Sequence, residues 1–319
     1  MKIQTENGIK EALRYIEASD PVKAQQITGA LFETDLECKE LSYTNRSCIF
    51  WIDTARRLKE FTDPYDKGIQ LLEEWKNFQT FLSRDEFIYE PAAVSFRIGF
   101  FNHALQHYRK IIKDNEAGNQ NLIRDSHRRA EIYKNAGICW KKLGNFENAR
   151  TSLSEANNIC PNQSAVLAEL ADCYALCGEE KYAKVLFREA FFLDPENIDI
   201  DFLDSELIKC LITKTIEKGY SGKVLHYWIP VFGVLGGIFN IKRELTSQEV
   251  CRLRQNIYAM ESEYKDPSCN AEILVPQLLN SYFWLVDHYV LNHENLTKIN
   301  EVLLKIKILD SSIYEQYTK

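Results

Sequence analysis

His103 and His107 stand four residues apart in the sequence HALQH, so both side chains would lie on one face of a helix. Two histidines with this spacing are a common pair of zinc ligands. Ala104, however, occupies the position where a zinc peptidase has its glutamate, and the sequence offers no evident third ligand. We therefore expect no metal ion and no cofactor.

Nine cysteines are spread along the chain, and two of them, Cys173 and Cys177, are one helical turn apart. No two have the C-x-x-C spacing of zinc and redox sites, and their odd number argues against a disulfide framework. We expect them to pack as small apolar side chains in a reducing compartment. The first residues lack the apolar run of a signal peptide, so the expected location is the cytoplasm.

Asp287 and His288 form a third group that could do chemistry, as an acid and a base beside Tyr282 and Tyr289. No nucleophile accompanies them, and the glycine-rich stretch 233–237 lacks the Lys-Ser/Thr of a phosphate-binding loop. We therefore assign no catalytic residue and expect a protein that is not an enzyme. An enzyme with its site near Asp287 and His288 is the alternative.

The composition favours a folded, soluble, helical chain. Of its 319 residues, 45% are apolar and 27% are charged, which is ordinary for a globular protein. Only 13 glycines and 8 prolines are present, so tight turns are few and an all-β fold is disfavoured. The net charge of −7 argues against a nucleic-acid partner, which calls for a basic surface.

Apolar residues recur at intervals of three and four, which predicts helices throughout. The expected helices span 5–18, 21–34, 37–59, 64–82, 86–98, 100–114, 119–143, 146–159, 164–177, 180–193, 198–218, 222–240, 247–264, 272–291 and 294–309. So many short helices with short joints are typical of an array of helical hairpins.

A repeat of 34 residues supports this interpretation, because 130–163 and 164–197 align without a gap. Small residues recur where two helices would cross, large ones where neighbouring hairpins would meet, glycine at the turn and proline at the end of the second helix. The matched pairs are Gly137 with Ala171, Trp140 with Tyr174, Gly144 with Gly178, Ala149 with Ala183, Leu153 with Phe187, Ala156 with Ala190 and Pro161 with Pro195.

The two repeats resemble the tetratricopeptide repeat (TPR) family, departing from its pattern at Ala136 and Glu180. The resemblance implies an all-α, right-handed solenoid of helical hairpins with a helical C-terminal cap. We expect degenerate repeats over 1–84, the TPR-like solenoid over 85–240 and the cap over 241–319. Within the first two segments, Ser19 and Gly99 are expected at the turns of weaker hairpins.

The resemblance also implies a non-enzymatic scaffold that binds a peptide or helix of a partner protein in a concave groove. The first helix of each hairpin would line this groove, and association with a second copy stays open. A clamp for a C-terminal carboxylate is not expected, because the second repeat offers acidic and small residues. The expected partner-binding residues are Arg128, Glu131, Lys134, Asn135, Ile138, Lys141, Lys142, Glu169 and Asp172.

The most apolar stretch, 224–241, is 18 residues long, which is the lower limit for a membrane span. Its Pro230 and three glycines argue against that interpretation, and we expect a buried helix that is kinked at Pro230. An interface with a partner and a membrane-associated assembly factor are the alternatives for this stretch.

Overall fold

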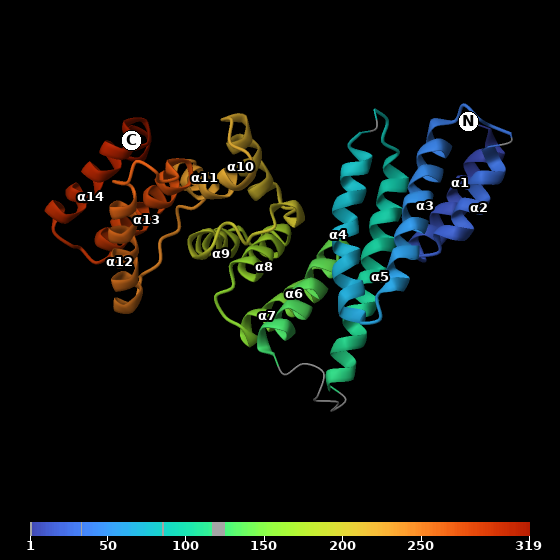
Figure 1. Cartoon of the computed structure of the whole chain (residues 1–319), viewed down its shortest axis with the longest axis horizontal. Coiled ribbons are helices and arrows are strands. Elements are labelled where there is room, and N and C mark those ends of the chain that lie inside the picture. Colours follow the sequence, from blue (N-terminus) through green and yellow to red (C-terminus); the bar gives the residue numbers. More distant parts are fainter. Residues whose placement is uncertain (1, 33, 85, 117–124) are drawn as a thin grey trace. The chain divides into compact units, whose positions relative to one another are not determined.

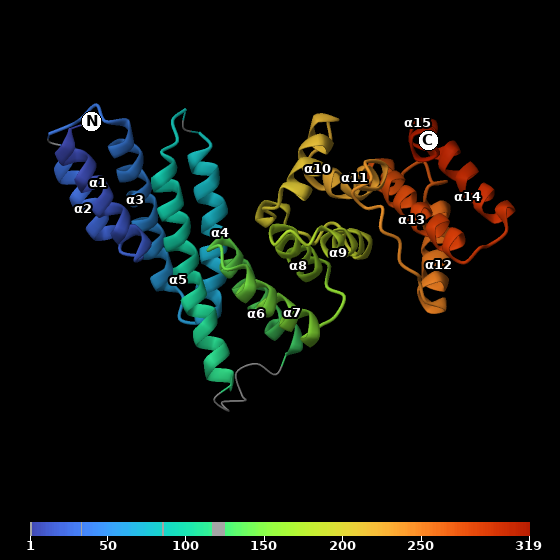
Figure 2. The ribbon, with the colours of Figure 1, turned by 180° about the vertical axis from the view of Figure 1, so that it is seen from behind.

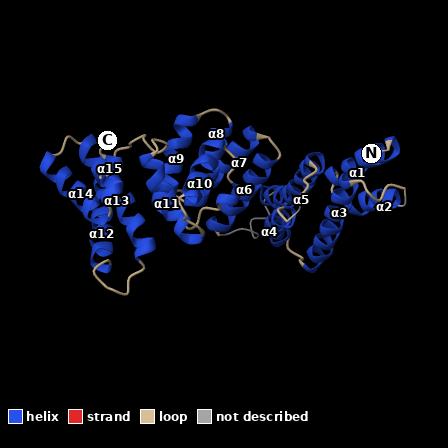
Figure 3. Ribbon diagram, turned by 90° about the horizontal axis from the view of Figure 1, so that it is seen from above, coloured by secondary structure: helices blue, strands red, loops and turns tan. Residues whose placement is uncertain are grey.

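The computed structural model describes residues 2–32, 34–84, 86–116 and 125–319. These residues form fifteen α-helices and two short 3₁₀ helices and contain no strand, which confirms the all-α prediction (Figures 1 and 3). The helices are α1 (Ile3–Glu17), α2 (Pro21–Phe32), α3 (Lys39–Arg57), α4 (Pro64–Leu82), α5 (Glu90–Glu116), α6 (Ser126–Lys142), α7 (Phe146–Ile159), α8 (Ser164–Leu176), α9 (Glu180–Leu193), α10 (Glu206–Glu217), α11 (Gly222–Leu235), α12 (Ser247–Glu263), α13 (Ala271–Leu291), α14 (Leu296–Leu309) and α15 (Ser311–Tyr317). The 3₁₀ helices are Leu58–Glu60 and Ile200–Phe202.

The chain consists of two compact units, Met1–Cys160 and Pro161–Lys319. The division falls between the two clear repeats, whereas the sequence suggested boundaries at 84/85 and 240/241. The first unit holds α1 to α7 and the second holds α8 to α15. Each unit, and the repeat within it, is described by itself.

The hairpins α6–α7 and α8–α9 turn in the same way. Gly144 donates its backbone N–H to the carbonyl of Lys141 at 2.9 Å, and Gly178 donates to Ala175 at 3.0 Å. The next N–H reaches back five residues in both hairpins, to Trp140 and to Tyr174, at 2.9 Å each. Both glycines have left-handed backbones, with φ of 78° and 80°. This Schellman motif confirms the turn glycine that the repeat predicts.

Two further hairpins use the same turn without glycine. Ser19 between α1 and α2 has φ 63°, and His293 between α13 and α14 has φ 52°. Each donates its N–H three residues back, and the following N–H reaches five residues back, to Tyr15 at 2.8 Å and to Tyr289 at 2.9 Å. An aromatic residue therefore precedes the left-handed residue by four positions in all four turns. The α13–α14 turn lies in a segment where the sequence showed no repeat.

Small side chains let the helices of each hairpin approach closely. A Cβ added to Gly137 on α6 would lie 2.6 Å from the Leu153 side chain of α7 and 3.3 Å from the Ala149 carbonyl. In α8–α9, Ala171, Ala183 and Ala190 are fully buried at the matched positions, together with Phe187. The expected alternation of small and bulky positions is present in both hairpins.

Gly99 does not form a turn, so the two helices expected at 86–98 and 100–114 are wrong. The single helix α5 runs through this position, and α1 packs against it. A Cβ on Gly99 would lie 2.3 Å from the carbonyl oxygen of Ile16 on α1 and 2.4 Å from the Trp51 ring on α3. This glycine therefore serves a close crossing between helices rather than a turn.

Aromatic side chains around this crossing form the core of the first unit. The ring of Trp51 lies 4.1 Å from that of Phe100, measured between centroids, and Trp75 lies 5.0 Å from Phe101. These residues come from α3, α4 and α5, which with α1 and α2 make one layered group (Figures 1 and 2). Most of the segment 1–84 thus packs on α5 rather than forming separate units.

The apolar stretch 224–241 lies in the core of the second unit, as expected, although its helix α11 ends at Leu235. This helix packs against α9, α10, α13 and α15, and Trp228, Ile229 and Val231 are buried. Among the described residues, no helix has the length and apolarity that crossing a bilayer requires. Two other expectations differ in detail, because 198–218 divides into a 3₁₀ turn and α10, and α15 follows the last expected helix.

The two helical glycines Gly99 and Gly29 provide a test of the close crossing. We expect Gly99→Ala to lower the free energy of unfolding by about 2 kcal/mol or more, because a backbone carbonyl and a buried ring must move. Gly29→Ala meets only the flexible end of Gln25 at 3.4 Å, so helix propensity should make it neutral or stabilising. Urea unfolding followed by circular dichroism measures both. Equal effects of the two substitutions would contradict the packing described at Gly99.

Candidate functional site

Arg128 and Glu131, two of the expected partner-binding residues, contact the start of α4. The guanidinium of Arg128 donates to Asp63 at 2.7 Å and lies over the Tyr65 ring, 4.3 Å from its centroid. The Tyr65 hydroxyl in turn donates to the carboxylate of Glu131. The structure therefore uses these two side chains to join α6 to α4 inside the first unit.

Asp172 has a structural contact as well. It is fully buried, and its two carboxylate oxygens accept the backbone N–H groups of Asp204 and Ser205 at 2.8 Å each. These N–H groups stand at the start of α10, where an acidic side chain stabilises the helix N-terminus. Most of the other expected groove residues are also buried, and only Lys134 is partly exposed. The buried ones are Asn135, Ile138, Lys141, Lys142 and Glu169.

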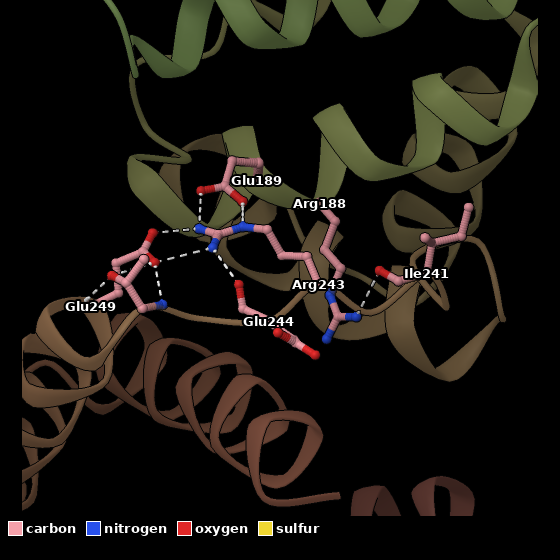
Figure 4. A network of polar contacts seen from close by, with 7 residues as sticks. Arg188, Glu189, Ile241, Arg243, Glu244 and Glu249 are labelled. Atoms are coloured by element: carbon pink, nitrogen blue, oxygen red, sulfur yellow. Dashed lines mark hydrogen bonds and ion pairs between the residues drawn. The ribbon is translucent and has the colours of Figure 1, made fainter. Parts of the chain in front are cut away.

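Asp287 belongs to a buried ionic network in the second unit. Its carboxylate accepts from Arg188 on α9 and lies 2.7 Å from the ammonium of Lys242. Arg188 also donates to the carbonyl of Ile241 at 3.1 Å (Figure 4). With both oxygens held by cations, this carboxylate is engaged in structure, and the arrangement does not support the acid–base role considered for it.

Arg243 is the second centre of this network (Figure 4). Its guanidinium makes two hydrogen bonds of 2.7 Å to Glu189 on α9 and two, of 2.7 and 3.2 Å, to Glu249 on α12. The hydrogen bonds from Arg243 lower the pKa of Glu249 to about 2. Arg188 and Arg243 also lie over the ring of Trp284 on α13, at 4.6 and 5.5 Å from its centroid. The network thus fixes the segment 241–246 and the start of α12.

His288 is separated from Asp287 in its contacts and lines a cavity of about 660 Å³ between α12 and α13. The Asn292 amide nitrogen donates to the carbonyl of His288 at 2.9 Å and lies 3.0 Å from its ring Nδ1. Because that nitrogen is a donor, Nδ1 accepts, and the neutral ring carries its proton on Nε2. Burial, with nearby Arg254, lowers the pKa of His288 and keeps the ring neutral.

This α12–α13 cavity combines apolar and polar side chains. Arg254 is exposed there; it donates to the Tyr289 hydroxyl at 3.2 Å and forms no ion pair with any described residue. Helical spacing places Cys251, Arg254 and Tyr258 on one face of α12. The lining residues are Leu245, Ser247, Val250, Cys251, Arg254, Gln255, Tyr258, His288, Asn292 and Glu294. Sequence reasoning missed this site, apart from His288, because two helices must meet to form it.

His103 and His107 lie on one face of α5, with ring centroids 5.1 Å apart. Burial lowers the pKa of both, that of His107 to about 4, with neighbouring Lys67 acting in the same direction. Nδ1 of His103 and Nε2 of His107 are buried without a hydrogen-bond partner in the described part of the chain. Among the same residues, no group of three or more potential ligands gathers around a common point.

A comparison with family models and with curated proteins found no match to this chain. The cavity, the ionic network and the hairpin geometry therefore carry the functional interpretation.

We expect Arg243→Ala to lower the free energy of unfolding by about 1 to 3 kcal/mol, because Glu189 and Glu249 lose the cation between them. Arg252→Ala, at an exposed arginine of α12, is the control and should change it by less than about 0.5 kcal/mol. Urea unfolding of the two variants measures the difference. If both lose the same stability, the network does not hold the start of α12.

A second prediction concerns pH. The pKa of His107 is lower in the folded chain, near 4, than in an unfolded one, near 6.5, so the folded state binds fewer protons between these values. Stability should therefore be complete above about pH 6.5 and fall as the pH drops toward 4. With allowance for solvent screening, we expect a loss of about 1 kcal/mol from His107 between about pH 7 and pH 5.

His107→Gln should reduce this loss, since the glutamine does not titrate in this range. The matched substitution His293→Asn, at an exposed histidine, should leave the pH dependence unchanged. The measurement is the urea midpoint at the two pH values. An unaltered pH dependence in His107→Gln would show that this imidazole is not the group that titrates.

Proposed function

We propose that this chain is a non-enzymatic interaction scaffold built of TPR-like helical hairpins, which holds a segment of a partner protein. The 34-residue spacing and the Schellman turns that it shares with two further hairpins support this proposal. In such arrays hairpins stack on their neighbours and leave long surfaces for peptides. Stacking of these hairpins into a right-handed solenoid is part of the proposal.

The observation that carries the binding function is the α12–α13 cavity. Its volume of about 660 Å³ lies within the range of pockets that bury small ligands or a few residues of a peptide. By contrast, Arg128, Glu131 and Asp172 of the expected groove already serve contacts within the chain. We therefore place the partner segment on α12 and α13 rather than on α6 and α8.

The other two functions considered have less support. An enzyme near Asp287 and His288 would need the carboxylate, which Arg188 and Lys242 hold. A membrane-associated factor would insert the stretch 224–241, whose helix α11 is buried in the second unit.

Crosslinking of the full chain in an extract of its native cell, followed by mass spectrometry, tests the proposed surface. We expect Tyr258→Ala and Cys251→Trp to reduce recovery of the crosslinked partner about fivefold or more, since aromatic side chains often dominate binding and a tryptophan fills the cavity. Tyr182→Ala, at an exposed tyrosine of α9, is the matched control and should retain it.

Recovery that is equal for all three variants and the unaltered chain would contradict binding at this cavity. Loss with Lys134→Glu alone would place the partner on α6 instead, in agreement with the groove that the sequence suggested.

A further inference from the structure

We infer that the α12–α13 cavity binds an acidic side chain of a partner peptide, flanked by apolar residues. This inference rests on the proposed function and specifies its ligand.

The positive charge of Arg254 is not compensated inside the cavity. Its hydrogen bond goes to the neutral hydroxyl of Tyr289, which leaves most of the five N–H groups of the guanidinium available. Glu294, the acidic residue of the lining, is paired with Lys298 at 2.9 Å. In a chain with a net charge of −7, this site therefore stands out as one that attracts a carboxylate.

His288 adds a neutral donor. Since Asn292 donates toward its Nδ1, the ring proton sits on Nε2, which can donate a second hydrogen bond to a carboxylate. A neutral imidazole adds no second charge, so the site matches a ligand with a single negative charge. Glu294, and Glu244 beside His288, oppose a doubly charged phosphate.

The apolar lining specifies the neighbours of the acidic residue. Leu245 and Val250 are buried members of the hydrophobic core of the second unit, and they form part of the cavity wall. Tyr258 is 76% exposed at the same cavity, so a partner can cover its ring. Apolar residues beside the carboxylate would bury these surfaces.

The donors in this site are side chains, whereas chain-terminal carboxylates are typically captured by nests of backbone N–H groups. We therefore commit to an aspartate or glutamate side chain within the partner segment.

Fluorescence polarisation with short, end-blocked peptides and the full chain tests this inference. The peptides carry a central glutamate, glutamine, lysine or phosphoserine between leucines, and a fifth combines the glutamine with a free C-terminal carboxylate. We expect the glutamate peptide to bind about tenfold more tightly than the glutamine peptide, with a preference that weakens at high salt.

Arg254→Gln should abolish the preference, Arg254→Lys should retain part of it, and Arg252→Gln on the same helix should leave it unchanged. Circular dichroism of each variant verifies that the helices are intact.

Equal binding of the glutamate and glutamine peptides would overturn the inference and leave the scaffold function standing, provided that Cys251→Trp still abolishes both. Tighter binding of the phosphoserine peptide, or of the one with a free C-terminus, would also overturn it, because another anion would then be the ligand. Absence of binding by all five peptides would overturn it too, and the crosslinking experiment would still decide the proposed function.

Discussion

The geometry of the proposed binding site depends on one carboxylate, that of Glu249. Its oxygens accept from the backbone N–H and the hydroxyl of Thr246, which closes a capping box at the start of α12, and the same group binds Arg243. Because Arg243 also binds Glu189 on α9, the first turn of α12 is tied to the hairpin α8–α9. The position of Arg254 and Tyr258, one and two turns further along α12, follows from this anchoring.

The turn between α13 and α14 completes the site from the other side. Its left-handed residue, His293, allows Glu294 to reach back to the carbonyl of Tyr289, which ends α13 directly after His288 and Asn292. The same turn closes α6 and α8, where glycine occupies the left-handed position. A geometry that organises the repeat hairpins therefore also positions the donors of the cavity, in a part of the chain where the sequence shows no repeat.

Sequence reasoning succeeded where local chemistry determines the structure. Gly144 and Gly178 stand at turns because left-handed backbone favours glycine, and their spacing of 34 residues made them visible. Gly99 was misread as a third turn, since a glycine needed for a close crossing looks the same in a sequence. Arg128 and Asp172 were expected to face a partner, but their actual partners, Asp63 and the start of α10, lie outside the repeat pattern. The cavity could not be predicted, because it depends on the packing of α12 against α13.

The left-handed conformations of Ser19 and His293 have a consequence for engineering this chain. A side chain in that region of backbone space is strained by about 1 kcal/mol relative to glycine. The Schellman hydrogen bonds at both corners outweigh that strain, so the corners form in spite of their residue types. Each corner is therefore a place where a single exchange to glycine would add heat resistance without altering a contact surface.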